Sequence, residues 1–300
     1  MASLSTLAPD VISAMFLRNL RHSLVYRNVC DTRFMADVAQ YGDSVAVPVI
    51  ERPSIREYTP GTDYTIDAGG TGTTTVNINQ AKYFAESVDL VHLRQARPNP
   101  IPELVSEGAY AVANDIDQYV AGLHSSLTTT TAGPGRTDLG KYELATTGNS
   151  VYNALLRCRE QLTRNGVVPR GSMNPQSPDG NLWVVLPPEL CTRLLSDSNL
   201  GLRASGFGDQ ATVNGYIGLL AGFMVFESVN VPFEDNTQSD TDDVYRVMAG
   251  ITRGMSLVIQ IQDTKMIEME KQYGMQISAL TVYGAAITLP GSVVRISIEP

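Results

Sequence analysis

The sequence predicts an α+β protein in which an extended β-hairpin and one long helix precede a compact domain. Residues 42–93 have β-type patterning, but their Thr-, Gly- and Asn-rich middle has too few apolar residues to form its own core. Residues 101–127 repeat apolar side chains every three to four positions, as an amphipathic helix does. From residue 149 onward, shorter helix and strand patterns alternate, which indicates a compact α+β domain.

The composition is that of an ordinary globular protein. Of 300 residues, 43% are hydrophobic and 18% are charged, which suits one large or two modest domains. The three cysteines lie far apart without CxxC spacing, and no N-x-S/T sequon exists, so we expect a reducing compartment. The start lacks the basic residues and apolar run of a signal peptide, and residues 217–226, the longest apolar run, fall short of the roughly 20 that cross a membrane. We therefore expect a soluble protein that is not secreted and has no membrane partner.

The net charge of -9 argues against sequence-specific nucleic-acid binding. No segment forms a basic stripe, which is the usual footprint of a protein that neutralises phosphates. The most basic part is the start of the chain, with Arg18, Arg21, Arg27 and Arg33. We expect these residues to be solvated charges or interface pairs, and at most to touch nucleic acid weakly and without sequence preference.

The first two elements are an N-terminal arm and a long hairpin. Pro9 and Asp10 suit the first turn of an amphipathic helix within an arm that spans residues 1–41. In the next segment Val45, Val47 and Val49 alternate with other residues, while Pro48 restricts that run to an edge strand or a bulged strand. Residues 67–72 are the expected tip of a two-stranded hairpin over residues 42–93.

The hairpin needs support from outside the chain. With the tip at residues 67–72, each leg has about 20 residues and spans some 65 Å at roughly 3.3 Å per residue. An isolated two-stranded hairpin is marginally stable in water.

Residues 101–127 predict a helix about 40 Å long, at 1.5 Å per residue. Pro102 fits its first turn, and Glu103 lies near its positive end. The helix has one apolar stripe, whereas Glu103, Asp115 and Asp117 form an acidic back that we expect to be solvated.

The Thr- and Gly-rich residues 128–148 form an expected connector and mark the main domain boundary. Beyond it, a helix ends at Asn165-Gly166, and Pro187-Pro188 opens a short helix after the buried strand 182–186. Residues 234–243 are an acidic loop. Further strands are expected around residues 223–226, 244–248, 265–270, 276–283 and 293–298.

No pattern in the chain predicts catalysis. Phosphate-binding, dinucleotide-binding, nucleophile-elbow and zinc-protease motifs are all absent. The histidines, His22, His92 and His124, lie in three separate segments. Asp115 and Asp117 resemble a metal-binding pair, but residues two apart on a helix do not face one another. We therefore expect no catalytic, cofactor-binding or metal-binding residues, and no enzyme.

Two other candidate sites have simpler explanations. The acidic residues 234–243 lack the alternating ligands and central Gly of a calcium loop, so a surface loop is expected. Trp183 lies in an apolar run and is expected in the core rather than as a platform for stacking a base.

The order of arm, hairpin, long helix and α+β domain resembles that of tailed-bacteriophage major capsid proteins with the HK97 fold. The resemblance covers nearly the whole chain, and the local patterns look most like the P22-like branch. These patterns are residues 166–169 (GVVP), 182–188 (LWVVLPP), 222–228 (GFMVFES), 280–284 (LTVYG), Leu289-Pro290 and Val293-Val294.

The resemblance implies a role for each segment. Residues 1–41 would be the N-terminal arm, and residues 42–93 the E-loop hairpin. A peripheral domain would comprise residues 94–148 and 246–275, with 101–127 as its spine helix. An axial domain would comprise residues 149–245 and 276–300.

The resemblance also implies partners and a location. Such subunits form pentamers and hexamers in an icosahedral shell around double-stranded DNA, assembled in the host cytoplasm and present in the virion. Scaffolding, portal and decoration proteins are the implied partners, besides non-specific contact with DNA. No long charged helical segment precedes the arm, so a fused scaffolding domain is not expected. Some relatives cross-link an E-loop Lys, but Lys82 lies away from the expected tip, so that chemistry is not carried over.

Two alternatives remain open. An encapsulin-type compartment shares the fold but encloses cargo protein instead of nucleic acid. A soluble enzyme with the hairpin as a lid would have to be active as a monomer.

Overall fold

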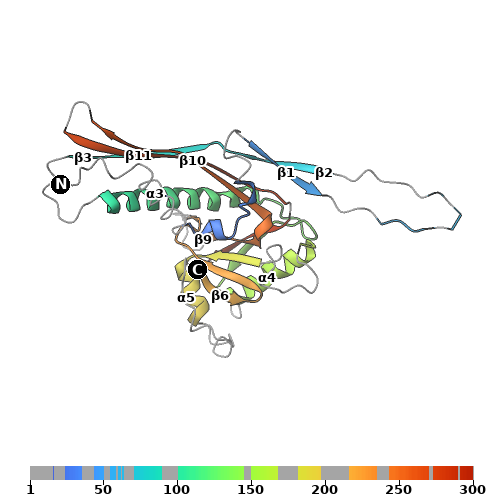
Figure 1. Cartoon of the computed structure of the whole chain (residues 1–300). Coiled ribbons are helices and arrows are strands. Elements are labelled where there is room, and N and C mark those ends of the chain that lie inside the picture. Colours follow the sequence, from blue (N-terminus) through green and yellow to red (C-terminus); the bar gives the residue numbers. More distant parts are fainter. Residues whose placement is uncertain are drawn as a thin grey trace.

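The computed structural model describes most of the chain outside its N-terminus and several loops. The described residues are 16, 24–35, 44–50, 55–58, 60–61, 63, 71–89, 101–144, 150–167, 182–196, 216–234, 243–269, 273–289 and 291–299. They form a long three-stranded sheet with a helix along it, a compact body below, and a limb that extends away from both (Figure 1).

The long sheet has the strand order β10-β11-β3 and is antiparallel throughout. Helix α3 (Ile101–Gly122) runs along one face and continues as the 3₁₀ turn η4 (Leu123–Ser126), so the predicted helix is confirmed. Its buried side chains recur at helical spacing, from Ile101 through Val105 and Val112 to Val120. The strands are β3 (Gln80–Asp89), β10 (Met255–Glu268) and β11 (Gly274–Ile287).

The compact body is built on a mixed sheet with the order β4-β12-β9-β5-β7-β6, while β8 pairs with the end of β9. Two helices belong to this body, α4 (Val151–Arg164) and α5 (Pro188–Ser196). The strands are β4 (Asp138–Glu143), β5 (Leu182–Leu186), β6 (Tyr216–Leu220), β7 (Phe223–Glu227), β8 (Phe233–Glu234), β9 (Val244–Ile251) and β12 (Val293–Glu299).

The centre of this body forms as its local sequence predicts. All five residues of β5 are buried, and Trp183 is fully enclosed, which confirms its place in the core. Helix α4 begins where the Ser150 hydroxyl accepts the Asn153 N–H at 3.2 Å, as an N-cap does. It ends at Asn165, and Gly166 follows with a φ of 69°, the left-handed conformation that favours glycine.

The limb is a two-stranded antiparallel hairpin of β1 (Ser44–Ile50) and β2 (Thr71–Asn77). The register pairs Ser44 with Asn77 and Ile50 with Thr71. Since both strands of such a ladder are edges, Pro48 lies where proline is tolerated. In Figure 1 the limb extends well beyond the end of the long sheet.

The predicted hairpin over residues 42–93 was wrong in its second leg. Strand β3 pairs with β11 and belongs to the long sheet. The predicted tip was also misplaced, because Thr71 and Gly72 lie within β2 and the register is centred on a turn at Pro60 and Gly61. Alternation in sequence identifies a strand but does not specify its partner, and β11 lies almost 200 residues further along the chain than β3.

Three other strands differ from expectation, and one of them is β11, which lies in the long sheet although residues 276–300 were expected in the axial domain. The segment expected to be a connector contains β4, which pairs in parallel with β12. Strand β9 lies between β12 and β5 in the body, although residues 246–275 were expected to leave it. In β4 the alternation is short and includes Gly140, whose φ of 78° interrupts an ordinary strand pattern. The division into domains stays a prediction.

Part of the N-terminal arm is described. Phe16 is buried and its ring stacks on that of Phe84, with centroids 5.7 Å apart. Residues 24–35 contain two 3₁₀ turns, η2 (Tyr26–Asn28) and η3 (Arg33–Met35). The rest of the predicted arm, the centre of the acidic loop, His22 and His92 lie outside the described residues.

Candidate assembly surfaces

The root of the limb is held by a small apolar cluster on the long sheet. Val45, Val47, Val76 and Ile78 pack with Val258 of β10, supported by the half-buried Phe34, Val282 and Ala286. The Thr74 hydroxyl donates to the Thr288 carbonyl at 3.2 Å. This cluster lies on the face of β11 opposite Tyr283, whose side chain points toward α3.

Gly284 permits this close contact. A Cβ built there would lie 2.0 Å from the Asn77 carbonyl oxygen and 2.9 Å from the Ile78 Cα, so a side chain cannot be accommodated without moving the backbone. At this point the chain leaves the limb and enters β3, because Gln80 pairs with Tyr283.

Beyond its root, the described part of the limb makes no core. In the described part between the strands, residues 55–58 are all exposed. Ile55 is 98% exposed and Tyr58 is 74% exposed. An isoleucine that is fully exposed at the end of an extended hairpin gains nothing from its own chain, so this end is a candidate contact for another molecule.

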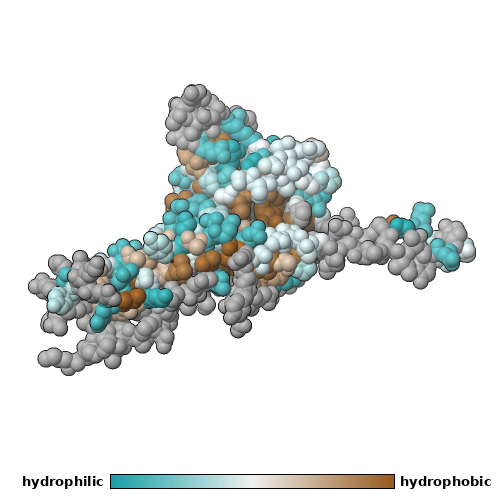
Figure 2. Space-filling view, turned by 90° about the horizontal axis from the view of Figure 1, so that it is seen from above, coloured by the Kyte–Doolittle hydropathy of each residue, from teal (hydrophilic) through white to brown (hydrophobic). Residues whose placement is uncertain are grey.

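The outer face of the long sheet also exposes large side chains. Tyr83 on β3 is 76% exposed, and Ile267 on β10 is 51% exposed. Tyr83 is paired with Leu280 of β11, and Ile267 is paired with Gln276 of the same strand. Because side chains alternate along a strand, Leu280 and Gln276 lie on the face of β11 opposite Tyr283, and Tyr83 and Ile267 lie on that face with them. Figure 2, which views the molecule from above, shows apolar patches among hydrophilic side chains on this side.

Helix α3 is joined to the inner face of the sheet by packing and by polar contacts. Gly108 makes room for the Phe84 ring, which would lie 2.7 Å from a Cβ at that position. The Tyr283 hydroxyl donates to Asp115, and the Lys82 ammonium lies 3.7 Å from the same carboxylate. Lys82, which was expected in the limb, therefore belongs to the long sheet.

The expectation that Asp117 is a solvated helix-face residue was wrong. Its side chain is buried, and its carboxylate accepts the backbone N–H groups of Val25 at 2.9 Å and Tyr26 at 3.2 Å. Asp115 and Asp117 thus point to different partners, which agrees with the rejection of a metal-binding pair. The sequence carried no signal for this role, because the partners lie more than 90 positions earlier in the chain.

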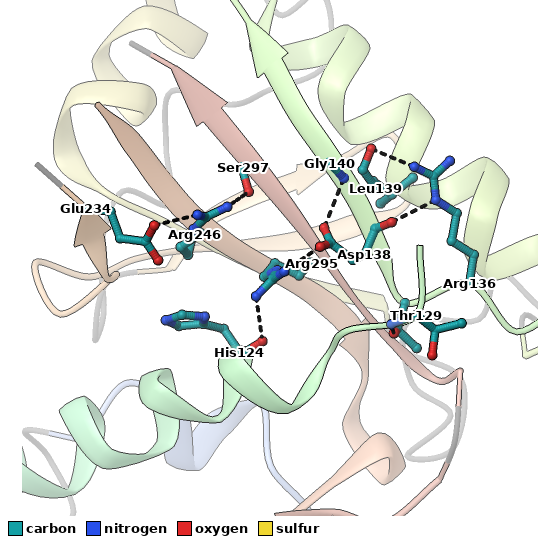
Figure 3. A network of polar contacts seen from close by, with 11 residues as sticks. His124, Thr129, Arg136, Asp138, Leu139, Gly140, Glu234, Arg246, Arg295 and Ser297 are labelled. Atoms are coloured by element: carbon teal, nitrogen blue, oxygen red, sulfur yellow. Dashed lines mark hydrogen bonds and ion pairs between the residues drawn. The ribbon is translucent and has the colours of Figure 1, made fainter. Parts of the chain in front are cut away.

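A polar network fastens the end of the helix to the body (Figure 3). Arg295 on β12 donates to the His124 carbonyl at 3.1 Å and forms an ion pair with Asp138, its register partner on β4. Arg246 on β9 bonds Ser297, its own register partner, and pairs with Glu234 on β8. Four strands and the helix end therefore meet through two arginines.

The network shifts the protonation of its members. Burial raises the pKa of Asp138, but hydrogen bonds from Arg295 and Gly140 outweigh it, so the net pKa lies below its usual value. Burial and the positive charge of Arg295 lower the pKa of His124. Its Nδ1 is buried and accepts or donates no hydrogen bond among the described residues.

Among the described residues, the network joins the helix end to the strands of the body. Within the described part of the chain, no group of three or more His, Cys, Asp or Glu side chains could hold a metal ion. Cys30, Cys158 and Cys191 are buried and unpaired, and burial raises the pKa of the Cys158 and Cys191 thiols to about 12, which keeps them protonated. No described helix is long and apolar enough to cross a membrane.

Comparison with solved structures shows which fold this is. A structure of Mycobacterium phage Che8 is similar with a TM-score of 0.64 and 22% identity, over 91% of this chain and 90% of that one. The capsid structure of cyanophage P-SCSP1u matches at 0.63 and 17%, over 86% and 84%. A virus-like particle from Pyrococcus furiosus matches at 0.56 and 12%, over 96% and 98%.

Sequence comparisons add nothing to this, since no family model and no curated protein matches the chain. The likeness covers 91% of this chain for the first of these structures and 86% for the second. The chain therefore has the mixed α+β fold of phage capsid proteins.

Proposed function

We propose that this chain is the major capsid protein of a tailed bacteriophage. Copies of it would assemble as pentamers and hexamers into an icosahedral HK97-type shell around double-stranded DNA. The observation that carries the proposal is the limb, which ends in an exposed Ile55 and Tyr58 on a chain with a capsid fold. A neighbouring subunit would supply the apolar contact that the limb lacks in its own chain.

Each part of the fold has a place in this proposal. Residues 1–41 would be the N-terminal arm, and β1 with β2 the E-loop. The long sheet and α3 would form the peripheral domain, and the body around β5 the axial domain at the five- and six-fold axes. The boundaries follow strand pairing, so β9 joins the axial group, β11 leaves that group for the peripheral domain, and β3 leaves the E-loop.

The partners follow from the same proposal. Scaffolding and portal proteins would act during assembly in the host cytoplasm, and decoration proteins would bind outside. The few arginines of the arm would contact packaged DNA without sequence preference. The net charge of -9 would disfavour tight binding of DNA by the rest of the chain.

Electron microscopy of the purified full chain tests the proposal. We expect closed shells, formed by the chain alone or with a scaffolding protein of the same phage. The double variant Ile55→Ser with Tyr58→Ser should prevent shell formation while leaving the fold intact by circular dichroism. The matched control changes the polar neighbours instead, Arg56→Ser with Glu57→Ser, and should still form shells.

Particle contents separate the proposal from the encapsulin-type alternative, to which the virus-like particle gives a likeness in fold. Nucleic acid inside particles from infected cells supports a capsid, whereas a cargo protein without nucleic acid supports a compartment. A chain that stays monomeric with and without scaffolding protein would contradict both the capsid and the compartment. It would favour the third hypothesis, a soluble enzyme with the hairpin as a lid.

A further inference from the structure

Asp117 is a buried carboxylate that joins the N-terminal segment 24–35 to helix α3. It is 2% exposed, and its two oxygens each accept one backbone N–H, from Val25 and Tyr26. Val25 is the N-cap of η2, where the first N–H groups of a helical turn have no acceptor within the turn. The carboxylate supplies both acceptors from a different element.

The described surroundings of Asp117 provide no compensating positive charge. Among the described residues, no cation forms an ion pair with it, and the titratable groups that face it are Tyr26 and Cys30. Burial, and then the charge of Asp117, raise the pKa of both groups above their usual values, so both are neutral at neutral pH. On the flanking elements, Asp31 pairs with Arg33 and Asp115 accepts the Tyr283 hydroxyl.

An unpaired buried carboxylate is costly in its ionised form. Burial raises the pKa of Asp117 to about 7, and the two N–H bonds offset only part of that effect. If segment 24–35 leaves the helix, water reaches the carboxylate and its pKa returns toward the ordinary 3.8. Docking and protonation are then linked over the range between these two values.

We propose that docking of residues 24–35 onto α3 takes up one proton at Asp117, so that this segment is held most firmly in mild acid. As the pH rises from about 4 to about 7, the equilibrium constant for docking of this segment falls by up to about tenfold per pH unit. Above about pH 7 the carboxylate is ionised in both states, and the docking equilibrium no longer changes. The bonds between Asp31 and β10, at 2.7 and 3.1 Å, are backbone pairs without this dependence.

Hydrogen exchange on the full chain, read by mass spectrometry between about pH 5 and 8, tests this. After correction for the intrinsic pH dependence of exchange, protection of a peptide covering residues 24–29 should fall up to about tenfold per pH unit as far as pH 7. Protection of α4 should not change in this way. The variant Asp117→Asn, which has no charge to gain, should give a flat profile, and Asp115→Asn should keep the wild-type slope.

Equal protection of residues 24–29 at low and neutral pH in the wild type would overturn the proposal. So would a wild-type slope that persists in Asp117→Asn. If Asp117→Asn does not fold, the wild-type profile decides alone, because a slope confined to this segment supports the coupling and its absence refutes it.

Discussion

The compact body and the limb reach order by different means. In the body, strand β5 is buried along its full length and lies between two other strands. In the limb, β1 and β2 bury only alternate side chains near the root, and residues 55–58 are fully on the surface. The body therefore has its own core, whereas the root of the limb packs on the long sheet, and the described residues at the end of the limb have no core.

A second contrast concerns the joints. The helix end meets the body through charged hydrogen bonds of Arg295, which require particular distances and directions. The limb meets the long sheet through valines and one glycine that has no room for a side chain. The first joint depends on charge and pH, and the second on shape.

The largest effect is expected in the body. Trp183→Ala should lower the free energy of unfolding by about 3–5 kcal/mol, because it leaves a large cavity beside β5. Urea unfolding followed by circular dichroism measures this loss. Val229→Ala, at a residue that is 83% exposed, is the control and should stay within about 0.5 kcal/mol. A small loss at Trp183 would show that the body does not depend on its core in this way.

The polar joint should come next. Asp138→Asn should cost about 2 kcal/mol, less than the roughly 3–5 kcal/mol for a deeply buried pair, because both partners retain some exposure. The pKa of Asp138 is lowered in the folded chain, so its contribution is present above about pH 4 and is lost as the pH falls through the folded value. Unfolding of wild type and variant should therefore converge in acid. A difference that does not depend on pH would contradict a charge-based joint.

The shape-dependent joint should respond to a single methyl group. Gly284→Ala should cost about 1–3 kcal/mol, because the new Cβ must displace the Asn77 backbone. Hydrogen exchange should locate the change in β1 and β2, with β5 unaffected. Gly122→Ala is the matched control, since a Cβ there meets nothing within 4 Å, and it should leave the limb's exchange unchanged. Equal effects of the two variants would show that the close contact does not hold the limb.

The smallest effect on stability should occur at the end of the limb. Ile55→Ser combined with Tyr58→Ser should change the free energy of unfolding of the unassembled chain by no more than about 0.5 kcal/mol. Urea unfolding at a protein concentration below the onset of assembly measures it. A clear destabilisation would place these side chains against the chain's own surface and would remove the argument for an outside partner.

Several elements could be predicted from local sequence because the forces that form them act locally. Helix α3 follows from apolar residues at helical spacing behind Pro102, and α4 ends where Asn165 and Gly166 allow a left-handed turn. The buried strand β5 follows from five consecutive apolar residues before a proline pair. The exposed end of the limb follows from a segment too polar to build a core.

The rest was decided by tertiary structure, since it depends on residues that are distant in the chain. Period-two alternation marks β3 as a strand but cannot choose β11 over β2 as its partner. The Arg295–Asp138 pair joins positions 157 residues apart, and Asp117 meets its donors only once the N-terminal segment lies on α3. Hydrophobic periodicity and turns depend on residues that are close together in the chain, so they can be predicted from the sequence. Strand partners and buried charges depend on which surfaces meet, and only the folded chain brings those together.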